Sequence, residues 1–267
     1  MDNFEYNYHS HTSRCGHATG EDEEYVVRAI EQGYKRMGFS DHVFLPNVHQ
    51  EGMRGDYSLL NEYMSSVKSL KKKYKSKIEI KLGFECEWYG DQYKSYYESL
   101  LKEKGFDYLI LGQHSYFDAN DRIRFYGDKS PLDELTRCEM YVSSLCEGIN
   151  SGLFSYVCHP DLFVYMFGYL SSFAKSSYTI CLKAKEKGIP LEINLARTRP
   201  DGFPSINPPF ELIYPFPPFW DIAKEVGNEI VVGVDAHNPN DYINTDYKAV
   251  REFIAQYGLK VNEHFKI

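Results

Sequence analysis

Short apolar runs alternate with longer amphipathic runs along the whole chain. Each apolar run spans four to seven residues, which is typical of buried β-strands. The predicted strands cover residues 4–8, 37–40, 78–84, 108–112, 154–158, 191–195 and 230–234. Nearly continuous apolar strands separated by helices predict a parallel sheet that is covered on both faces.

The runs between these strands carry apolar residues at helical spacing. Thr19-Gly20-Glu21-Asp22 is typical of a helix start, and Gly33 of a helix end. Pro131 is suited to the first position of a helix that runs to residue 150. Further helices are predicted at residues 59–74, 93–104, 178–187, 219–226 and 247–257, and a proline-rich loop follows the strand at 191–195.

Seven strand–helix units in 267 residues predict one α/β domain over residues 1–267. An open doubly wound sheet and a closed barrel resembling a TIM barrel both fit this order. The first strand is not followed by a glycine-rich phosphate loop, which argues against a dinucleotide-binding sheet.

Charge and composition limit which cellular environment and which binding partners we expect for the protein. Thirty basic and thirty-eight acidic residues give a net charge of −8, which argues against a nucleic-acid partner. The chain has no apolar run of the roughly 18 residues that span a membrane, and residues 1–5 do not resemble a signal peptide. Six dispersed cysteines without a C-x-x-C pair indicate reduced, mostly buried thiols. We therefore expect a cytoplasmic protein that does not bind membranes.

The histidines fall in a pattern that indicates chemistry. Most of the nine, together with two carboxylates, lie at or just beyond the carboxyl end of a predicted strand: His9, His11, His17, His42, Glu85, His114, His159, Asp235 and His237. The carboxyl ends of parallel barrel strands share one face, where active sites lie. His49 and His264 have no such placement and are expected to be ordinary histidines.

Nine candidate ligands exceed the about three or four that one metal ion takes from a protein. They therefore predict two or three divalent ions, with a carboxylate bridging some of them. Histidine-rich ligation suits Zn, Mn and Fe alike. Clustered ions of this kind activate a water and hold a phosphoryl group, which points to hydrolysis of a phosphoester or an amide.

The strand-end segments resemble the motifs of the polymerase and histidinol phosphatase (PHP) family. The matching segments are His9-Ser10-His11, Ser40-Asp41-His42, Gly83-Phe84-Glu85, Gly112-Gln113-His114, Cys158-His159-Pro160-Asp161 and Val234-Asp235-Ala236-His237. They occur in the family's order over residues 6 to about 240. The resemblance implies a distorted seven-stranded β/α barrel.

The resemblance also implies three metal ions and their ligands. His9, His11, Glu85 and Asp235 would hold the first ion. Glu85 would bridge to a second ion, held also by His114 and His159. His17, His42 and His237 would hold the third.

Chain length and the segment Glu192-Ile193-Asn194 with Arg197 resemble the stand-alone histidinol-phosphate phosphatases of histidine biosynthesis. The expected substrate is L-histidinol phosphate, a small phosphomonoester. Glu85, Asp235 and Arg197 are the expected catalytic residues, with Arg197 binding phosphate while a water attacks phosphorus in line. In this chain Leu195-Ala196 stands where the branch has a glycine-bearing sequence.

Substrate contacts beyond Arg197 are predicted from loops on the same face. Arg199 and Arg14 are candidates for the phosphate, and Glu87 and Tyr116 for the amine and imidazole.

Three other interpretations stay open. They are a related phosphoesterase acting on nucleotides or oligonucleotides, a metal-dependent amidohydrolase, and a non-catalytic metal-binding module.

Overall fold

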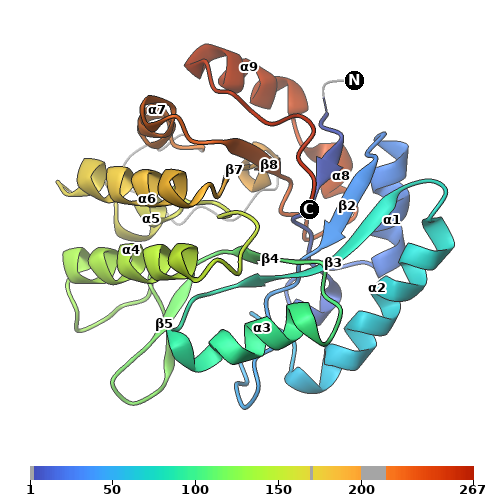
Figure 1. The fold of residues 1–267 in the computed structure, drawn as a ribbon, viewed down its shortest axis with the longest axis horizontal. Helices are drawn as coiled ribbons and strands as arrows, with labels where there is room; N and C mark the ends of the chain where they lie inside the picture. Colours follow the sequence, from blue (N-terminus) through green and yellow to red (C-terminus); the bar gives the residue numbers. More distant parts are fainter. Residues whose placement is uncertain (1–2, 169–170, 200–214) are drawn as a thin grey trace.

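Parallel strands form a curled sheet, and helices pack around its outside (Figure 1). The computed structural model describes residues 3–168, 171–199 and 215–267, and of Arg197 it describes the backbone alone. The α/β class predicted from the alternating runs is confirmed.

Eight strands are present in the described residues, at β1 (Tyr6–Asn7), β2 (Arg36–Phe39), β3 (Glu79–Cys86), β4 (Tyr108–Leu111), β5 (Ser115–Phe117), β6 (Ile123–Phe125), β7 (Leu191–Asn194) and β8 (Ile230–Gly233). Strands β1 to β4 form one parallel sheet in chain order, and β7 pairs with β8 in parallel. Between them β5 and β6 form an antiparallel hairpin, which the sequence pattern did not predict.

Single bridges connect these sheets. Val157 forms parallel bridges with Leu111 on one side and Leu191 on the other, which links β4 to β7. Ser10 bridges Ala236, which links the residues after β1 to those after β8. The segment 154–158, predicted as a strand, is thus present as one bridging residue flanked by loops.

The helices are α1 (Asp22–Glu31), α2 (Leu60–Tyr74), α3 (Lys94–Lys102), α4 (Glu134–Ser151), α5 (Phe163–Phe167), α6 (Phe173–Lys187), α7 (Pro217–Val226), α8 (Asp241–Asn244) and α9 (Tyr247–Tyr257). The bounds predicted for α9 are confirmed, and α5 and α8 were not predicted. The proline-rich loop lies mostly outside the described residues.

Capping side chains set where two of these helices begin. Glu21 and Glu24 form a capping box at the start of α1, which begins at Asp22, within the segment predicted as a helix start. The prediction that Pro131 is the first residue of α4 was wrong. Asp133 caps that helix instead, because its side chain accepts the Thr136 backbone N–H at 2.9 Å.

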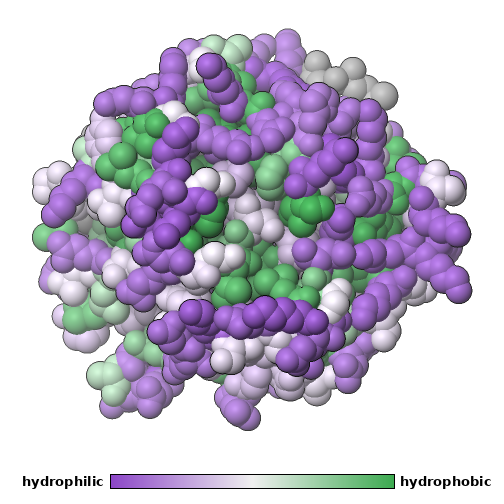
Figure 2. Space-filling view, viewed as in Figure 1, coloured by the Kyte–Doolittle hydropathy of each residue, from purple (hydrophilic) through white to green (hydrophobic). Residues whose placement is uncertain are grey.

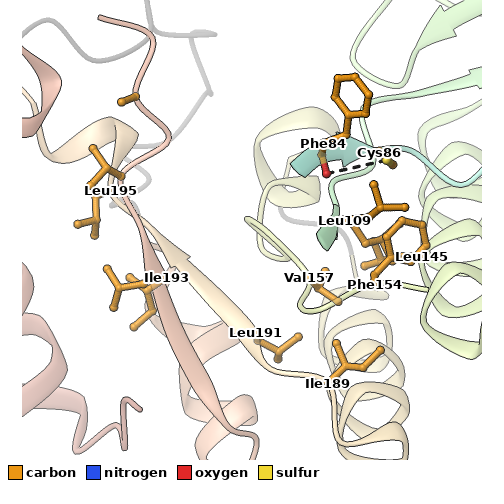
Figure 3. Close-up of a cluster of buried hydrophobic side chains, with 14 of the residues drawn as sticks. Phe84, Cys86, Leu109, Leu145, Phe154, Val157, Ile189, Leu191, Ile193 and Leu195 are labelled. Atoms are coloured by element: carbon orange, nitrogen blue, oxygen red, sulfur yellow. Dashed lines mark hydrogen bonds between the residues drawn. The ribbon is translucent and has the colours of Figure 1, made fainter. Parts of the chain in front are cut away.

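The core lies on both faces of the curled sheet. Leu109 lies near Leu145 of α4 in a buried cluster that also contains Phe84, Val157 and Leu191 (Figure 3). The alternate residues of β4, Tyr108 and Ile110, belong instead to a second buried cluster with tyrosines of β1 and its flank. Burial of both faces explains why the strands read as nearly continuous apolar runs.

Tyr108 of β4 requires glycines on β3 and on the strand beyond it, β2. Its hydroxyl donates to the backbone oxygens of Tyr8 at 2.6 Å and Phe39 at 3.1 Å. A Cβ atom at Gly38 or Gly83 would lie 2.1 or 2.4 Å from the nearest Tyr108 atom. The phenol therefore crosses the inside of the sheet where side chains are absent.

The exterior is mostly hydrophilic on the face shown in Figure 2, with smaller hydrophobic areas between the charged side chains. Among the described helices there is none whose length and apolar content would suit it to crossing a membrane.

Candidate metal centre

All nine predicted ligands lie at one end of the parallel strands. His9 and His11 follow β1, His42 follows β2, and Glu85 lies near the end of β3. The others follow β4, Val157 or β8, except His17, which comes after a short 3-10 helix. Strands far apart in sequence thus bring these side chains together, as the barrel geometry predicts.

His9, His11 and Asp235 form the first group. Asp235 Oδ1 lies 3.4 Å from His9 Nε2 and 3.1 Å from His11 Nε2. Glu85 Oε2 lies 3.5 Å from the same His9 nitrogen and 3.4 Å from the same His11 nitrogen. The four side chains therefore converge with their polar atoms toward one point.

Glu85 joins this group to further histidines. Its Oε1 lies 2.7 Å from His159 Nε2 and 3.4 Å from His114 Nε2. Its Oε2 lies 3.1 Å from His42 Nδ1. One buried carboxylate thus contacts imidazoles from several strands, which is the placement that a bridging ligand needs.

His17, His42 and His237 form the third group. The Nε2 atoms of His17 and His237 lie 3.0 Å apart, and the ring centres of His17 and His42 are 5.4 Å apart. Their ligand atoms all lie within 4.8 Å of one another, and the same holds for His9, His11 and Asp235.

Burial and charge shift the pKa values of these groups in both directions. Although burial opposes it, Glu192 and Asp235 raise the pKa of His9, and Glu85 and Glu87 raise that of His114. Burial lowers the pKa of His11 and His42, and it lowers the pKa of His237 to about 3. Burial opposes the ionisation of Glu85 and Asp235, but the surrounding histidines lower both carboxyl pKa values well below their usual range. Neutral imidazoles and ionised carboxylates are the donor forms that a divalent cation requires.

Several buried polar atoms at this centre lack hydrogen-bond partners within the described part of the chain. They include His9 Nε2, His11 Nε2, His42 Nδ1 and Asp235 Oδ1. An unsatisfied buried polar atom costs about 1–3 kcal/mol, so such a cluster is unfavourable by itself. The donor set and its orphaned atoms fit divalent metal ions.

The backbone is strained at two of these positions. His159 has a φ of 33° and Asp235 a φ of 53°, in the left-handed region that non-glycine residues rarely adopt. Strain of this kind concentrates at functional sites, where the surrounding structure fixes it.

Sequence reasoning missed two cysteines beside the centre. Cys158 Sγ lies 3.3 Å from Glu85 Oε1, and Cys15 Sγ lies 3.9 Å from His17 Nε2. All six cysteines are free, in agreement with the prediction. In the sequence, the signal for these two was the position of Cys158 directly before His159 and of Cys15 two residues before His17.

Sequence reasoning also missed the groups behind the ligands. Glu192 of β7 contacts His9 Nδ1 with both carboxylate oxygens, at 3.0 and 3.1 Å. Glu87, predicted as a substrate contact, lies 3.5 Å from His114 Nδ1 and pairs with Arg54 at 2.9 Å. Both carboxylates are buried.

The other predicted substrate contacts have partners within the protein. Arg199 donates to the backbone oxygens of Val234 at 2.7 Å and Asp235 at 3.2 Å. Arg14 pairs with Asp22 and Glu62, and Tyr116 contacts the Ser130 hydroxyl at 3.2 Å. The Arg197 side chain lies outside the described residues, although its backbone belongs to a 3-10 turn, η4 (Ala196–Thr198).

The centre opens into a cavity of about 490 Å³. Glu85, Asp235 and most of the histidines line one part of it. The remaining lining includes the apolar side chains Met53, Phe125, Leu162 and Met166, and the acid Asp128. The cavity therefore joins the histidine-rich region to an apolar wall.

Two curated proteins match most of this chain. A probable histidinol-phosphatase of Deinococcus radiodurans is 29% identical over 238 residues, covering 87% of this chain and 86% of the relative. A histidinol-phosphatase of Bacillus subtilis is 25% identical over 272 residues, covering 91% and 97%.

A solved histidinol phosphate phosphatase of Lactococcus lactis, complexed with zinc, L-histidinol and phosphate, shares the fold. Its TM-score is 0.70 at 20% identity, over 96% of this chain and 95% of that one. The model of the PHP domain family matches residues 7–196. The chain therefore belongs to the PHP domain family.

Proposed function

We propose that this protein is a metal-dependent histidinol-phosphatase, which hydrolyses L-histidinol phosphate to L-histidinol and phosphate in histidine biosynthesis. The observation that carries the proposal is the convergence of seven histidines and two carboxylates with orphaned ligand atoms, of which five histidines and both carboxylates line one cavity. Two relatives that match over most of their length carry the same activity in their names. The Lactococcus structure holds zinc and both products of the reaction.

The proposed centre binds three divalent ions, of zinc, manganese or iron, with the ligand sets implied by the family. A bridging role for Glu85 is supported by its two oxygens, because Oε2 faces His9 and His11 while Oε1 faces His159. The close grouping of His17, His42 and His237 supports a separate third ion. Histidine and carboxylate donors suit all three metals.

We also propose that the whole chain forms one domain around a distorted seven-stranded barrel. Val157 would supply the fifth strand, because it bridges both β4 and β7. The bridge from Ser10 to Ala236 would close the barrel between β8 and β1. The backbone N–H of His11 donates to Ala236 O at 2.8 Å, which supports this closure.

Bound metals would supply an activated water and positive charge for the phosphoryl oxygens. The chain's own residues would then orient the substrate. Glu85 and Asp235 present ionised oxygens toward the cavity. Burial favours the neutral forms of His11, His42 and His237 by lowering their pKa values. Asp235 is the proposed proton guide for the leaving alkoxide, since it lines the cavity. Arg197 is the proposed phosphate contact, because the adjacent Ala196 lines the same cavity.

The substrate has an anionic end and an imidazole end, and the cavity offers a matching pair of regions. The phosphate would lie on the histidine-rich side. The imidazole would contact the apolar wall of Phe125, Leu162 and Met166, with Asp128 available to the ammonium group. Arg199 would act indirectly, because its guanidinium holds the backbone of Asp235.

The His42→Asn substitution tests this proposal. We expect lower metal content, measured by mass spectrometry, and at least a 100-fold lower kcat/KM for L-histidinol phosphate. His49→Asn is the matched control, because the His49 side chain is 75% exposed and pairs only with Asp56 among the described residues. Unchanged metal content and turnover in His42→Asn would overturn the proposal.

A further inference from the structure

Glu192 lies directly behind one of the convergent histidines. Its carboxylate is buried at the centre of β7, and both oxygens approach His9 Nδ1. The opposite ring nitrogen, His9 Nε2, faces Glu85 and Asp235. A carboxylate that accepts the Nδ1 proton leaves the Nε2 lone pair directed toward the centre.

Asn194, two residues further along the same strand, connects this carboxylate to a second candidate ligand. Its side-chain amide donates to Glu192 Oε1 at 3.0 Å and to Asp235 Oδ2 at 3.1 Å. The other Asp235 oxygen, Oδ1, is the one that faces His9 and His11. The amide therefore fixes which oxygen of Asp235 turns toward the histidines.

The neighbouring strand makes room for this network. Gly233 of β8 pairs in register with Asn194. A Cβ atom at Gly233 would lie 2.1 Å from Glu192 Oε2. Glycine at this position is thus a condition for the observed carboxylate position.

We propose that Glu192, held by Asn194 and accommodated by Gly233, is a positioning residue that fixes His9 and Asp235 as metal ligands. The inference rests on the proposed function, since it assumes that these two residues bind metal. Groups that hydrogen-bond a metal ligand from behind commonly change metal affinity about 10- to 100-fold.

The Glu192→Gln substitution is the direct test. The glutamine amide would present an N–H donor beside His9 Nδ1, which favours the tautomer with its proton on Nε2. Zinc affinity is measured by competition with a chromogenic chelator, with no substrate present. We expect it to fall about 10- to 100-fold. Asp161→Asn is the control, because it is equally buried and accepts from Phe216 N and Trp220 Nε1.

A second variant keeps the test valid if Glu192→Gln does not fold. Asn194→Ala removes the amide that joins Glu192 to Asp235, and it should weaken zinc binding in the same assay. Wild-type zinc affinity, within twofold, in either folded variant would overturn the inference while leaving the proposed function intact. Failure of the wild-type protein to bind zinc, manganese or iron would overturn the proposed function itself.

Discussion

Arg54 and Glu87 form a buried ion pair whose removal should strongly destabilise the protein. Arg54 Nη2 lies 2.9 Å from Glu87 Oε1, and both side chains are at most 1% exposed. The same guanidinium donates to Gln50 and to the Val43 backbone oxygen, both at 2.9 Å. Arg54→Met keeps much of the side-chain volume but removes the charge and these donors.

The magnitude follows from the group that is left behind. Removing one partner of a buried pair costs about 3–5 kcal/mol, because the remaining charge is buried without compensation. Burial opposes the ionisation of Glu87, and Arg54 is the leading opposing influence that lowers its pKa. Replacing both partners removes the uncompensated charge, so the double variant Arg54→Met/Glu87→Met should be less destabilised than the sum of the single variants.

Urea denaturation of the four proteins of this cycle measures the free energies of unfolding. A chelator should be present throughout, because metal binding would add its own stabilisation to the folded state. The exposed pair Lys248 and Glu252 provides a control cycle, for which we expect about 0–1 kcal/mol. A loss below about 1 kcal/mol in Arg54→Met, or additive losses in the double variant, would refute the reasoning.

Two further predictions concern a glycine of the sheet and the pH dependence of stability. Gly83→Ala should lower the free energy of unfolding by about 1–3 kcal/mol, because its Cβ would overlap the Tyr108 ring; wild-type stability in urea would contradict this. Burial lowers the pKa of His237 from 6.5 to about 3, so the unfolded chain binds its proton first as the pH falls. The contribution of His237 to the stability of the metal-free protein should therefore be fully present above pH 6.5. It should decline toward pH 3, by up to about 1.4 kcal/mol per pH unit. Thermal melts across this range should show a smaller decline in His237→Asn, and equal declines would contradict the assignment.

The strand–helix order could be predicted because burial of both sheet faces leaves a strong apolar signal. The predictions that were wrong or missing concern segments where the apolar pattern alone does not determine the structure. Residues 154–158 are as apolar as a strand, but Val157 alone forms the bridges there. Helix α4 begins at Glu134, directly after its cap Asp133, and not at Pro131. The Asp133 side chain accepts a backbone N–H that would otherwise lack a partner, whereas proline merely has no N–H of its own to satisfy. The hairpin of β5 and β6 is short and partly exposed, so it has no clear period.

The convergence of the histidines could be predicted because a parallel topology gathers strand ends at one face. The roles of Glu192 and Glu87 could not, because a carboxylate near a site resembles a ligand or a substrate contact in sequence. Only three-dimensional packing shows that Glu87 pairs with Arg54 from a distant loop. Arg199 was predicted to contact phosphate for the same reason, yet its guanidinium binds backbone oxygens beside Asp235.

Phosphate release from L-histidinol phosphate by the purified protein, with its bound metals counted, tests the proposed function most directly. Nucleotide phosphates and simple phosphomonoesters should be assayed beside it at the same protein concentration. We expect about three metal ions per chain, loss of activity on chelation, and a kcat/KM about 100-fold or more higher for L-histidinol phosphate than for the other esters. Undiminished turnover by metal-free protein, or faster turnover of another ester, would contradict the proposed function.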